Sequence, residues 1–469
     1  TGVDPVSLHR VEELLGAEVS ALHRGDRAAD HEVAERVEEP GSVHQRRRRH
    51  VAGSGFPDAF GDGIEVLFRW QALLVVGVEY AEQLRGKHDV LRRALTAHAR
   101  LQSAKLLPCL PSPRIAGYRN RAKMAVGLSR HGGGAVGYFR GGTREIVDAV
   151  ACGVLVPELL ETTQRLREFL LTAKNVPREL RHIDVRCGDD PDRQHLTLVF
   201  RATESPRIPI ERLRKVCPKV DGISINLNPS AGPQVLRGPI LPLWGAREVW
   251  VTHAGTRMRV SPGSFFQVNL DLLPAIHERM AAFLEGGRVL ADLYAGVGTH
   301  GLALREAFGR VLFVEGTRSA IGDLKATVRA HRVENADIVP ASVERSIEKI
   351  GTARPDAVVL NPARTGADEA VLAAVAASPA TRVAYLSCAP GTLARDLDRL
   401  ADAGFETVSA QPIDMMPQTR QVEALALLRR TSPGSRPDRP APPRHGRDEA
   451  SRRTTSPRTR RRSRKDPRG

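Results

Sequence analysis

One cysteine stands where a strand is expected to end and a helix to begin. The apolar run Arg382-Val-Ala-Tyr-Leu386 predicts a buried strand, and Ser387-Cys388-Ala389-Pro390-Gly391 follows it. Thr392 is expected to cap the helix that starts there. Ligands bind at the carboxyl ends of strands in open α/β sheets, and a helix N-terminus favours a thiolate, so Cys388 is a candidate nucleophile. The alternative is a small buried residue that closes a strand.

A carboxylate enters a second apolar run, Glu423-Ala-Leu-Ala-Leu-Leu428. Burying a carboxylate is costly unless it has a role or a partner, so Glu423 is a candidate general base. The alternative is a rim carboxylate paired with Arg420. A cysteine and a base together suit chemistry at C5 of uracil. That carbon becomes nucleophilic when a thiolate adds at C6, and a base must later remove the C5 proton so that the thiol can leave.

A glycine-rich segment predicts a cofactor loop between a strand and a helix. It reads Asp292-Leu-Tyr-Ala-Gly-Val-Gly-Thr299, and Gly296 and Gly298 allow the backbone to approach a ligand closely. Glu315 ends the next expected strand, where a carboxylate can bind both hydroxyls of a ribose. The loop lacks the third glycine of a dinucleotide fingerprint, so S-adenosylmethionine fits it better than NAD. The alternative is a turn without a ligand.

The turn Asn361-Pro-Ala-Arg-Thr-Gly366 follows the fourth expected strand. An Asn or Asp followed by Pro at such a strand end typically lies beside the substrate base in methyltransferases. Enzymes that methylate exocyclic amines carry an aromatic residue at the fourth position of this motif, whereas Arg364 stands here. The target is therefore expected to be an atom other than an amino group. The alternative is a plain strand-ending turn.

A parallel sheet is needed to bring these residues together. Strands and helices alternate from Pro274 to Arg430, which predicts a doubly wound, Rossmann-like α/β domain at 271–430. The expected strands are 289–294, 310–316, 337–341, 355–361, 383–388, 406–414 and 422–430. The expected helices are 300–308, 318–331, 367–378 and 392–403.

The region before this domain is rich in strands. Period-two alternation and one helix at 157–175 predict an α+β central domain, which spans 78–270 with a leading helix from about Glu79. Its basic residues predict either an RNA-facing or a merely solvated sheet face: Arg119, Arg121, Lys123, Arg140 and Arg144. Residues 1–77 are expected to be divergent or disordered, and 431–469 to form a disordered basic tail.

The charge balance makes nucleic acid the first expected partner and an anionic membrane surface the second. The net charge is +16, and residues 431–469 hold 13 Lys and Arg against 4 Asp and Glu. The five cysteines form no CxxC pair, which indicates a reducing, cytoplasmic location. The sequence contains no apolar run of about 18 residues, so no membrane span is predicted. A monomer is expected.

Taken together, these motifs resemble those of the RNA uracil-5-methyltransferase family, which makes 5-methyluridine in ribosomal and transfer RNA. The resemblance covers about residues 79–430. It rests on SFFQVN (264–269), DLYAGVGT (292–299), VEG (314–316), NPARTG (361–366), LSCAPGTLARDL (386–397) and TRQVE (419–423). It implies a class I, S-adenosylmethionine-dependent fold with Cys388 as nucleophile and Glu423 as proton acceptor. Residues implied to contact the methyl donor or lie beside it are Gln267, Tyr294, Gly296, Thr299, Glu315 and Asn361.

Two further segments resemble the family's RNA-handling parts. PSPRIAGYRNRAK (111–123) is similar to its central domain, and LNPSAGPQVLRGPILPLWG (227–245) is closer to the ribosomal than to the transfer-RNA branch. The expected partner is therefore 23S ribosomal RNA, with tRNA as the alternative. A different alternative is an RNA-binding protein that keeps the fold but has impaired catalysis.

The chain departs from the family at its N-terminus. Many relatives hold a [4Fe-4S] cluster with three cysteines there and a fourth in a segment that resembles the one around Cys152. No cysteine precedes Cys109 in this sequence, and one cysteine cannot hold a cluster. The expected cofactor is S-adenosylmethionine, a [4Fe-4S] cluster is doubtful, and no metal site is predicted. Asn361 also replaces the commoner Asp, and Ala295 stands where many relatives carry Cys.

Overall fold

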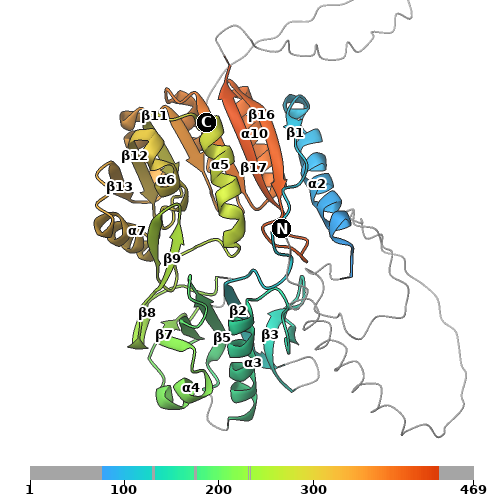
Figure 1. Cartoon of the computed structure of the whole chain (residues 1–469), viewed down its shortest axis with the longest axis vertical. Helices are drawn as coiled ribbons and strands as arrows, with labels where there is room; N and C mark the ends of the chain where they lie inside the picture. The colour runs from blue at the N-terminus through green and yellow to red at the C-terminus, as the bar shows by residue number, and fades with distance from the viewer. Residues whose placement is uncertain (1–76, 129–132, 174–176, 231, 233, 432–469) are drawn as a thin grey trace, which may run out of the picture. The chain divides into compact units, whose positions relative to one another are not determined.

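The computed structural model describes residues 77–128, 133–173, 177–230, 232 and 234–431 (Figure 1). The expectations for the N-terminal segment before Gly77 and for the basic tail after Thr431 lie outside the described residues. Within the described part, no helix is long and apolar enough to cross a membrane.

An eight-stranded sheet carries the candidate catalytic residues. Its strand order is β1-β16-β17-β15-β14-β11-β12-β13, and all neighbours are parallel except β17, which is antiparallel to β15 and β16. The strands are β1 (Lys105–Leu106), β11 (Gly287–Leu293), β12 (Phe308–Glu315), β13 (Ala336–Pro340), β14 (Ala357–Leu360), β15 (Arg382–Ser387), β16 (Phe405–Ile413) and β17 (Glu423–Arg430). The predicted doubly wound α/β fold is confirmed.

Helices cover both faces of this sheet because its central strands are apolar on both sides. Neighbouring residues of β14, such as Val358 and Val359, point into different cores. One core is closed by α2 (Tyr80–Thr96), α8 (Ile347–Ala353), α9 (Glu369–Ala377) and α10 (Pro390–Asp402). The other is closed by α5 (Leu273–Leu284), α6 (Thr299–Leu304) and α7 (Arg318–Ala330), and Figure 1 shows α5 lying along the sheet.

The leading helix packs on the eight-stranded sheet. Its buried face consists of Gln83, Lys87, Leu91 and Leu95, and both leucines join the core that α10 closes. Strand β1 then pairs with β16. The expected boundary at 270/271 assigned this helix to the central domain, but the helix contributes to the core of the large sheet. The α-helix ends at Thr96, and a 3₁₀ turn, η1 (Ala99–Leu101), follows it.

The central region forms an α+β unit around a seven-stranded sheet of order β4-β3-β2-β5-β6-β7-β8. Its strands are β2 (Arg121–Leu128), β3 (Gly134–Phe139), β4 (Ile146–Asp148), β5 (Leu180–Cys187), β6 (Gln194–Phe200), β7 (Val220–Leu227) and β8 (Ile240–Gly245). Its helices are α3 (Pro157–Thr172) and α4 (Ile210–Val216), which pack over the sheet core. A separate hairpin, β9 (Val249–His253) and β10 (Thr256–Val260), shares its core with α5 and α7.

Candidate functional site

Cys388 and Glu423 lie at the adjoining ends of β15 and β17. The antiparallel register of these strands ends with the pair Ser387 and Ala424, Cys388 is the first residue after β15, and Glu423 is the first residue of β17. The two groups are close enough for the charge of Glu423 to raise the pKa of the Cys388 thiol. On its other side Glu423 pairs with Ile413 of β16, and only 5% of it is exposed. The two residues were predicted from separate motifs, and strand pairing brings them together.

Burial keeps both groups protonated in the free protein. Burial raises the pKa of Glu423 to about 8. Burial, followed by the charge of Glu423, also raises the pKa of the Cys388 thiol, while the Arg364 guanidinium acts in the opposite direction on both groups. The expectation that the helix N-terminus would favour a thiolate is therefore wrong for the free protein, because desolvation and a neighbouring carboxylate outweigh the helix dipole.

Arg364 reaches the site from the turn that follows β14. Its Nη2 donates to Oε1 of Gln421, 2.5 Å away, and Gln421 precedes Glu423 by two residues. The turn is tied to α10 because Oγ1 of Thr392 donates to the carbonyl oxygen of Arg364 at 3.0 Å. The predicted cap at Thr392 is wrong: α10 starts at Pro390, and Ala389 is its N-cap. Proline suits the first helical position because its missing N–H would have no partner there.

The cofactor loop and Glu315 meet at the carboxyl ends of β11 and β12. Oε2 of Glu315 accepts from the backbone N–H of Gly296 at 2.8 Å, and Oε1 accepts from that of Thr317 at 2.5 Å. Gly298 has a φ of 89°, and a Cβ there would lie 2.6 Å from a methyl carbon of Leu324. The loop can therefore pass this close to α7 only with a glycine at this position.

Tyr294 and Thr299 flank the glycines of this loop. Tyr294 has a φ of 62°, and its hydroxyl donates to Oε1 of Glu344 at 3.0 Å. Thr299 is buried and is the first residue of α6. Both predicted cofactor residues therefore lie at the end of β11 with Gly296, although their contacts to a ligand stay a prediction.

Sequence reasoning did not select Asp292, which lies fully buried on β11. Its Oδ2 accepts from the N–H of Gly301 at 2.8 Å, while Oδ1 has no hydrogen-bond partner among the described residues. Burial raises its pKa to about 7, and the charge of Glu315 adds to this effect. The available signal was an acidic residue within an apolar strand, the same signal that pointed to Glu423.

Gln267 lies in a segment that is anchored from two other elements. The carboxylate of Asp323 on α7 accepts from the hydroxyls of Ser261 and Ser264, each at 2.6 Å. Nδ2 of Asn120 donates to the carbonyl oxygen of Gln267 at 3.4 Å, and only 6% of Gln267 is exposed. The carbonyl of Phe265 lies 4.0 Å from where a Cβ on Gly296 would be, so this segment runs beside the cofactor loop.

Asn361 stands between the cofactor loop and the Cys388 strand. Its backbone N–H donates to the carbonyl oxygen of Leu293 at 3.4 Å, at the end of β11. Its side-chain Nδ2 lies 3.1 Å from Nε2 of His300, a residue that the sequence motifs did not single out. The predicted set around Glu315, Asn361 and Cys388 thus occupies one edge of the sheet, where the parallel strands end.

Comparison with known proteins identifies the family. Residues 248–431 match a family model described as tRNA (Uracil-5-)-methyltransferase. An uncharacterized RNA methyltransferase of Geobacter sulfurreducens is 33% identical over 378 residues, which cover 76% of this chain and 74% of the relative. The chain belongs to the RNA uracil-5-methyltransferase family. The predicted family is confirmed, and this protein is an S-adenosylmethionine-dependent RNA methyltransferase.

Two further similarities agree with this assignment. An uncharacterized RNA methyltransferase of Thermosynechococcus vestitus is 32% identical over 75% of this chain and 80% of its own length. The crystal structure of the Pyrococcus abyssi tRNA (uracil-54, C5)-methyltransferase in complex with S-adenosyl-L-homocysteine matches with a TM-score of 0.60. It is 26% identical and covers 75% of this chain and 84% of that one.

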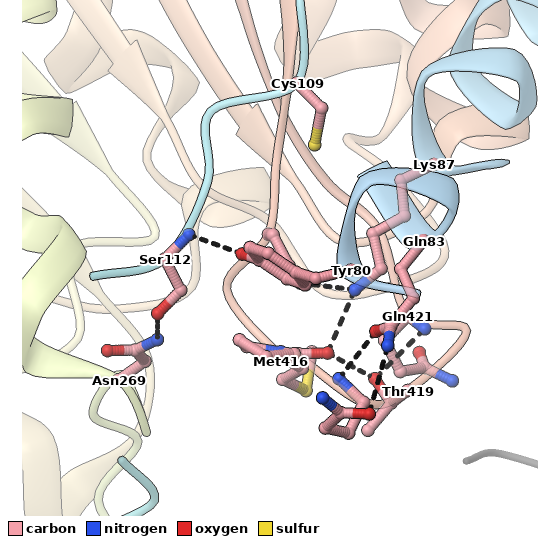
Figure 2. A network of polar contacts seen from close by, with 12 residues as sticks. Tyr80, Gln83, Lys87, Cys109, Ser112, Asn269, Met416, Thr419 and Gln421 are labelled. Atoms are coloured by element: carbon pink, nitrogen blue, oxygen red, sulfur yellow. Dashed lines mark hydrogen bonds and ion pairs between the residues drawn. The ribbon is translucent and has the colours of Figure 1, made fainter. Parts of the chain in front are cut away.

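In this methyltransferase, the leading helix anchors the loop that precedes Glu423 (Figure 2). The buried Nζ of Lys87 forms an ion pair with Asp414 and donates to the carbonyl oxygen of Met416 at 2.9 Å. Gln83 exchanges two hydrogen bonds with Gln418, each at 3.0 Å. Lys87 and Gln83 are both fully buried. They are buried because this loop provides their polar partners.

The residues at the strand ends fit the methyl donor expected of the family. A carboxylate at the end of β12, a glycine loop with left-handed backbone and an unpartnered buried oxygen of Asp292 together provide acceptors and close backbone approach. A ribose and an amino group are the parts of S-adenosylmethionine that need such acceptors.

The described residues do not fit a [4Fe-4S] cluster. Cys152 is buried in the core of the seven-stranded sheet, and burial raises its pKa. Among the residues that the structure describes, no group of three or more His, Cys, Asp or Glu side chains could hold a metal ion. The sequence contains no cysteine before Cys109, so the doubt about the cluster stands.

The basic residues of the central domain that were considered for RNA contact differ in burial and in their ion pairs. Arg121 is buried and forms two hydrogen bonds with the carboxylate of Asp184, at 2.8 and 2.5 Å, so both expectations for this residue, an RNA-facing and a merely solvated side chain, are wrong. Arg140 likewise pairs with Glu145. Arg119 is half-buried, and its Nε donates to the carbonyl oxygen of Arg121 at 2.8 Å. Lys123 and Arg144 are exposed and available to a phosphate backbone.

Proposed function

We propose that this enzyme methylates C5 of a uridine in 23S ribosomal RNA, with Cys388 as nucleophile and Glu423 as base. The proposal rests on the position of Cys388 and Glu423 directly beyond the last strand pair, Ser387 and Ala424, where the charge of Glu423 acts on the Cys388 thiol. C5 methylation needs a thiol that adds at C6 and a base that reaches the neighbouring carbon of the same ring, and two neighbouring side chains at the ends of adjacent strands meet this need.

Each residue of the pair has one task in this reaction. The Cys388 thiol loses its proton to solvent and its sulfur forms a bond to C6, which makes C5 electron-rich. S-adenosylmethionine, when bound, supplies the methyl group that C5 takes. Glu423 in its ionised form then removes the proton from C5, and the bond from sulfur to C6 breaks. Arg364 favours the ionised forms of both groups, because its charge lowers the pKa of each.

The target base must leave its stack to reach these residues. Phe265 is 58% exposed and precedes Gln267 by two residues, next to the cofactor loop. An exposed phenyl ring offers a surface on which an unstacked base can lie. The exposed Lys123 and Arg144 supply positive charge for the RNA backbone.

Release of tritium from RNA labelled at C5 of uracil tests the reaction. Wild-type enzyme with S-adenosylmethionine should release tritium from labelled 23S ribosomal RNA, and Glu423→Gln should accumulate a covalent adduct of RNA with Cys388. Cys388→Ala is the matched control and should give neither signal. Methyl transfer without tritium release would contradict the C5 assignment.

The choice of RNA rests on residues 227–245, whose pattern is closer to the ribosomal branch. The structural similarity to a tRNA (uracil-54, C5)-methyltransferase makes tRNA the second candidate. Mapping 5-methyluridine in ribosomal and transfer RNA after deletion of the gene separates the two. Loss of the modification from tRNA alone would contradict the ribosomal assignment.

A further inference from the structure

Three imidazoles form a continuous hydrogen-bonded chain that ends on Asn361. Nε2 of His253 lies 2.6 Å from Nδ1 of His277, and Nε2 of His277 lies 2.8 Å from Nδ1 of His300. Nε2 of His300 then lies 3.1 Å from Nδ2 of Asn361. The three histidines come from β9, α5 and α6, so the histidine chain (His253, His277 and His300) crosses from the hairpin to the strand ends that carry the site.

The histidine chain is uncharged. His277 and His300 are 6% and 2% exposed, and His253 is half-buried. Burial lowers the pKa of all three, that of His300 to about 4, and their mutual repulsion acts in the same direction on His277 and His300. Each ring is therefore neutral near pH 7 and has one N–H and one lone pair.

Neutral rings in series must all donate in the same direction. The amide nitrogen of Asn361 faces Nε2 of His300, so this nitrogen accepts and the Nδ1–H of His300 donates to Nε2 of His277. The Nδ1–H of His277 in turn donates to Nε2 of His253. If the amide rotated by 180°, Oδ1 of Asn361 would face the lone pair on Nε2 of His300. This repulsion would be relieved only if all three rings changed tautomer. The chain therefore couples the orientation of the amide to the tautomers of all three rings.

We propose that the histidine chain is a positioning device that holds Oδ1 of Asn361 turned away from His300, as a hydrogen-bond acceptor for the target base. This inference rests on the proposed function, in which Asn361 lies beside that base. N3 of uracil carries a hydrogen and can donate to such an acceptor. N3 of cytosine carries a lone pair and is repelled by it. The histidine chain thus selects uracil over cytosine, and His300 is its specificity-determining contact.

Discrimination between the two bases tests the role of the chain. The substrates are a short RNA transcript that contains the mapped target uridine and a second transcript with cytidine at that position. We expect His300→Phe to reduce the ratio of kcat/KM for uridine over cytidine by about 10- to 100-fold, the effect of one hydrogen bond to a buried group. His300→Gln, which keeps a polar group near Asn361, should retain more of the ratio.

A matched control removes a buried histidine elsewhere. His195 in the central domain is fully buried and contacts Oγ of Ser224 at 3.2 Å. His195→Phe should leave the ratio unchanged, even if the overall rate falls. If His300→Phe lowers the rates for both bases equally, the chain has only a structural role and the proposal is overturned.

The tautomers can be measured on the free enzyme without any reaction. In ¹⁵N spectra of histidine-labelled protein, all three rings should carry the proton on Nδ1. Asn361→Asp offers His300 only acceptors, so His277 and His253 should both change to the Nε2–H form. An unchanged His277 tautomer in this variant would overturn the proposal. Absence of uridine methylation by the wild type would instead contradict the proposed function, so the two failures are distinguishable.

Discussion

Cys388 and Glu423 are neighbours at the adjoining ends of β15 and β17, directly beyond the last strand pair, Ser387 and Ala424. Glu423 is almost fully buried at this position, and burial raises its pKa to about 8. Within this pair of a buried acid and a half-buried thiol, Glu423 is the group whose protonation changes near pH 8, while the pKa of the Cys388 thiol is raised above its ordinary value. The free energy of unfolding should therefore fall, and the rate of methylation should rise, as the pH increases.

Glu423→Gln should stabilise the protein at alkaline pH. The folded-state pKa of Glu423 lies above its ordinary value of 4.5, so folded protein binds more protons than unfolded protein between these two values. Stability is therefore lost as the pH rises from 4.5 towards 8. At pH 9 the variant should be more stable than wild type by roughly 2–4 kcal/mol, with little difference at pH 4. Urea unfolding of the variant and the wild type at pH 4 and at pH 9 measures this difference in the free energy of unfolding. The same difference at both pH values would contradict the prediction.

The rate of tritium release should rise with pH through about 8. Glu423 takes the C5 proton only in its ionised form, and burial keeps it protonated below that pH. Arg364→Gln removes the charge that lowers the pKa of both Cys388 and Glu423, so the profile should move to higher pH and kcat/KM at pH 7 should fall by about 10- to 100-fold. Arg329→Gln, on the exposed surface of α7, is the control. An unmoved profile in Arg364→Gln would contradict this role.

Lys87→Met should destabilise the fold and the site together. Lys87 is buried in an ion pair with Asp414, so the substitution leaves a carboxylate without its counter-charge. The expected loss is about 3–5 kcal/mol in urea unfolding. The double variant Lys87→Met with Asp414→Leu should recover part of it. The control Arg85→Gln breaks an exposed pair with Glu82 and should cost less than about 1 kcal/mol.

Gly301→Ala should weaken binding of S-adenosylmethionine. A Cβ at this position would lie 2.4 Å from the ring of Phe313 and 2.8 Å from Oδ2 of Asp292, so α6 must move away from the cofactor loop. We expect the Kd for S-adenosylmethionine, measured by titration calorimetry, to rise at least about 10-fold, the effect of roughly 1.4 kcal/mol. Gly351→Ala adds a methyl group on α8 with no atom within 4 Å and should leave the Kd unchanged. Equal affinities of the two variants would contradict the prediction.

The order of elements around the site follows from local patterns. Each strand of the large sheet from β11 to β17 was predicted within a few residues, because buried parallel strands are short apolar runs between amphipathic helices. Helices α5 and α8 were not predicted. Patterns also misjudged Thr392, because a proline at the first helical position begins α10 three residues earlier than a threonine cap at 392 would.

The sequence by itself determined the family and the residue types at the strand ends, since Cys388, Glu423, Glu315 and Asn361 each begin, end or follow a recognisable strand. Only the tertiary structure decided how they act on one another. Strand pairing, which depends on distant chain segments, brought Glu423 next to Cys388; burial raised the pKa of both groups, and the charge of Glu423 added to the effect on Cys388. The histidine chain likewise joins β9, α5 and α6. No local pattern predicts it, because its three residues meet only when these elements pack.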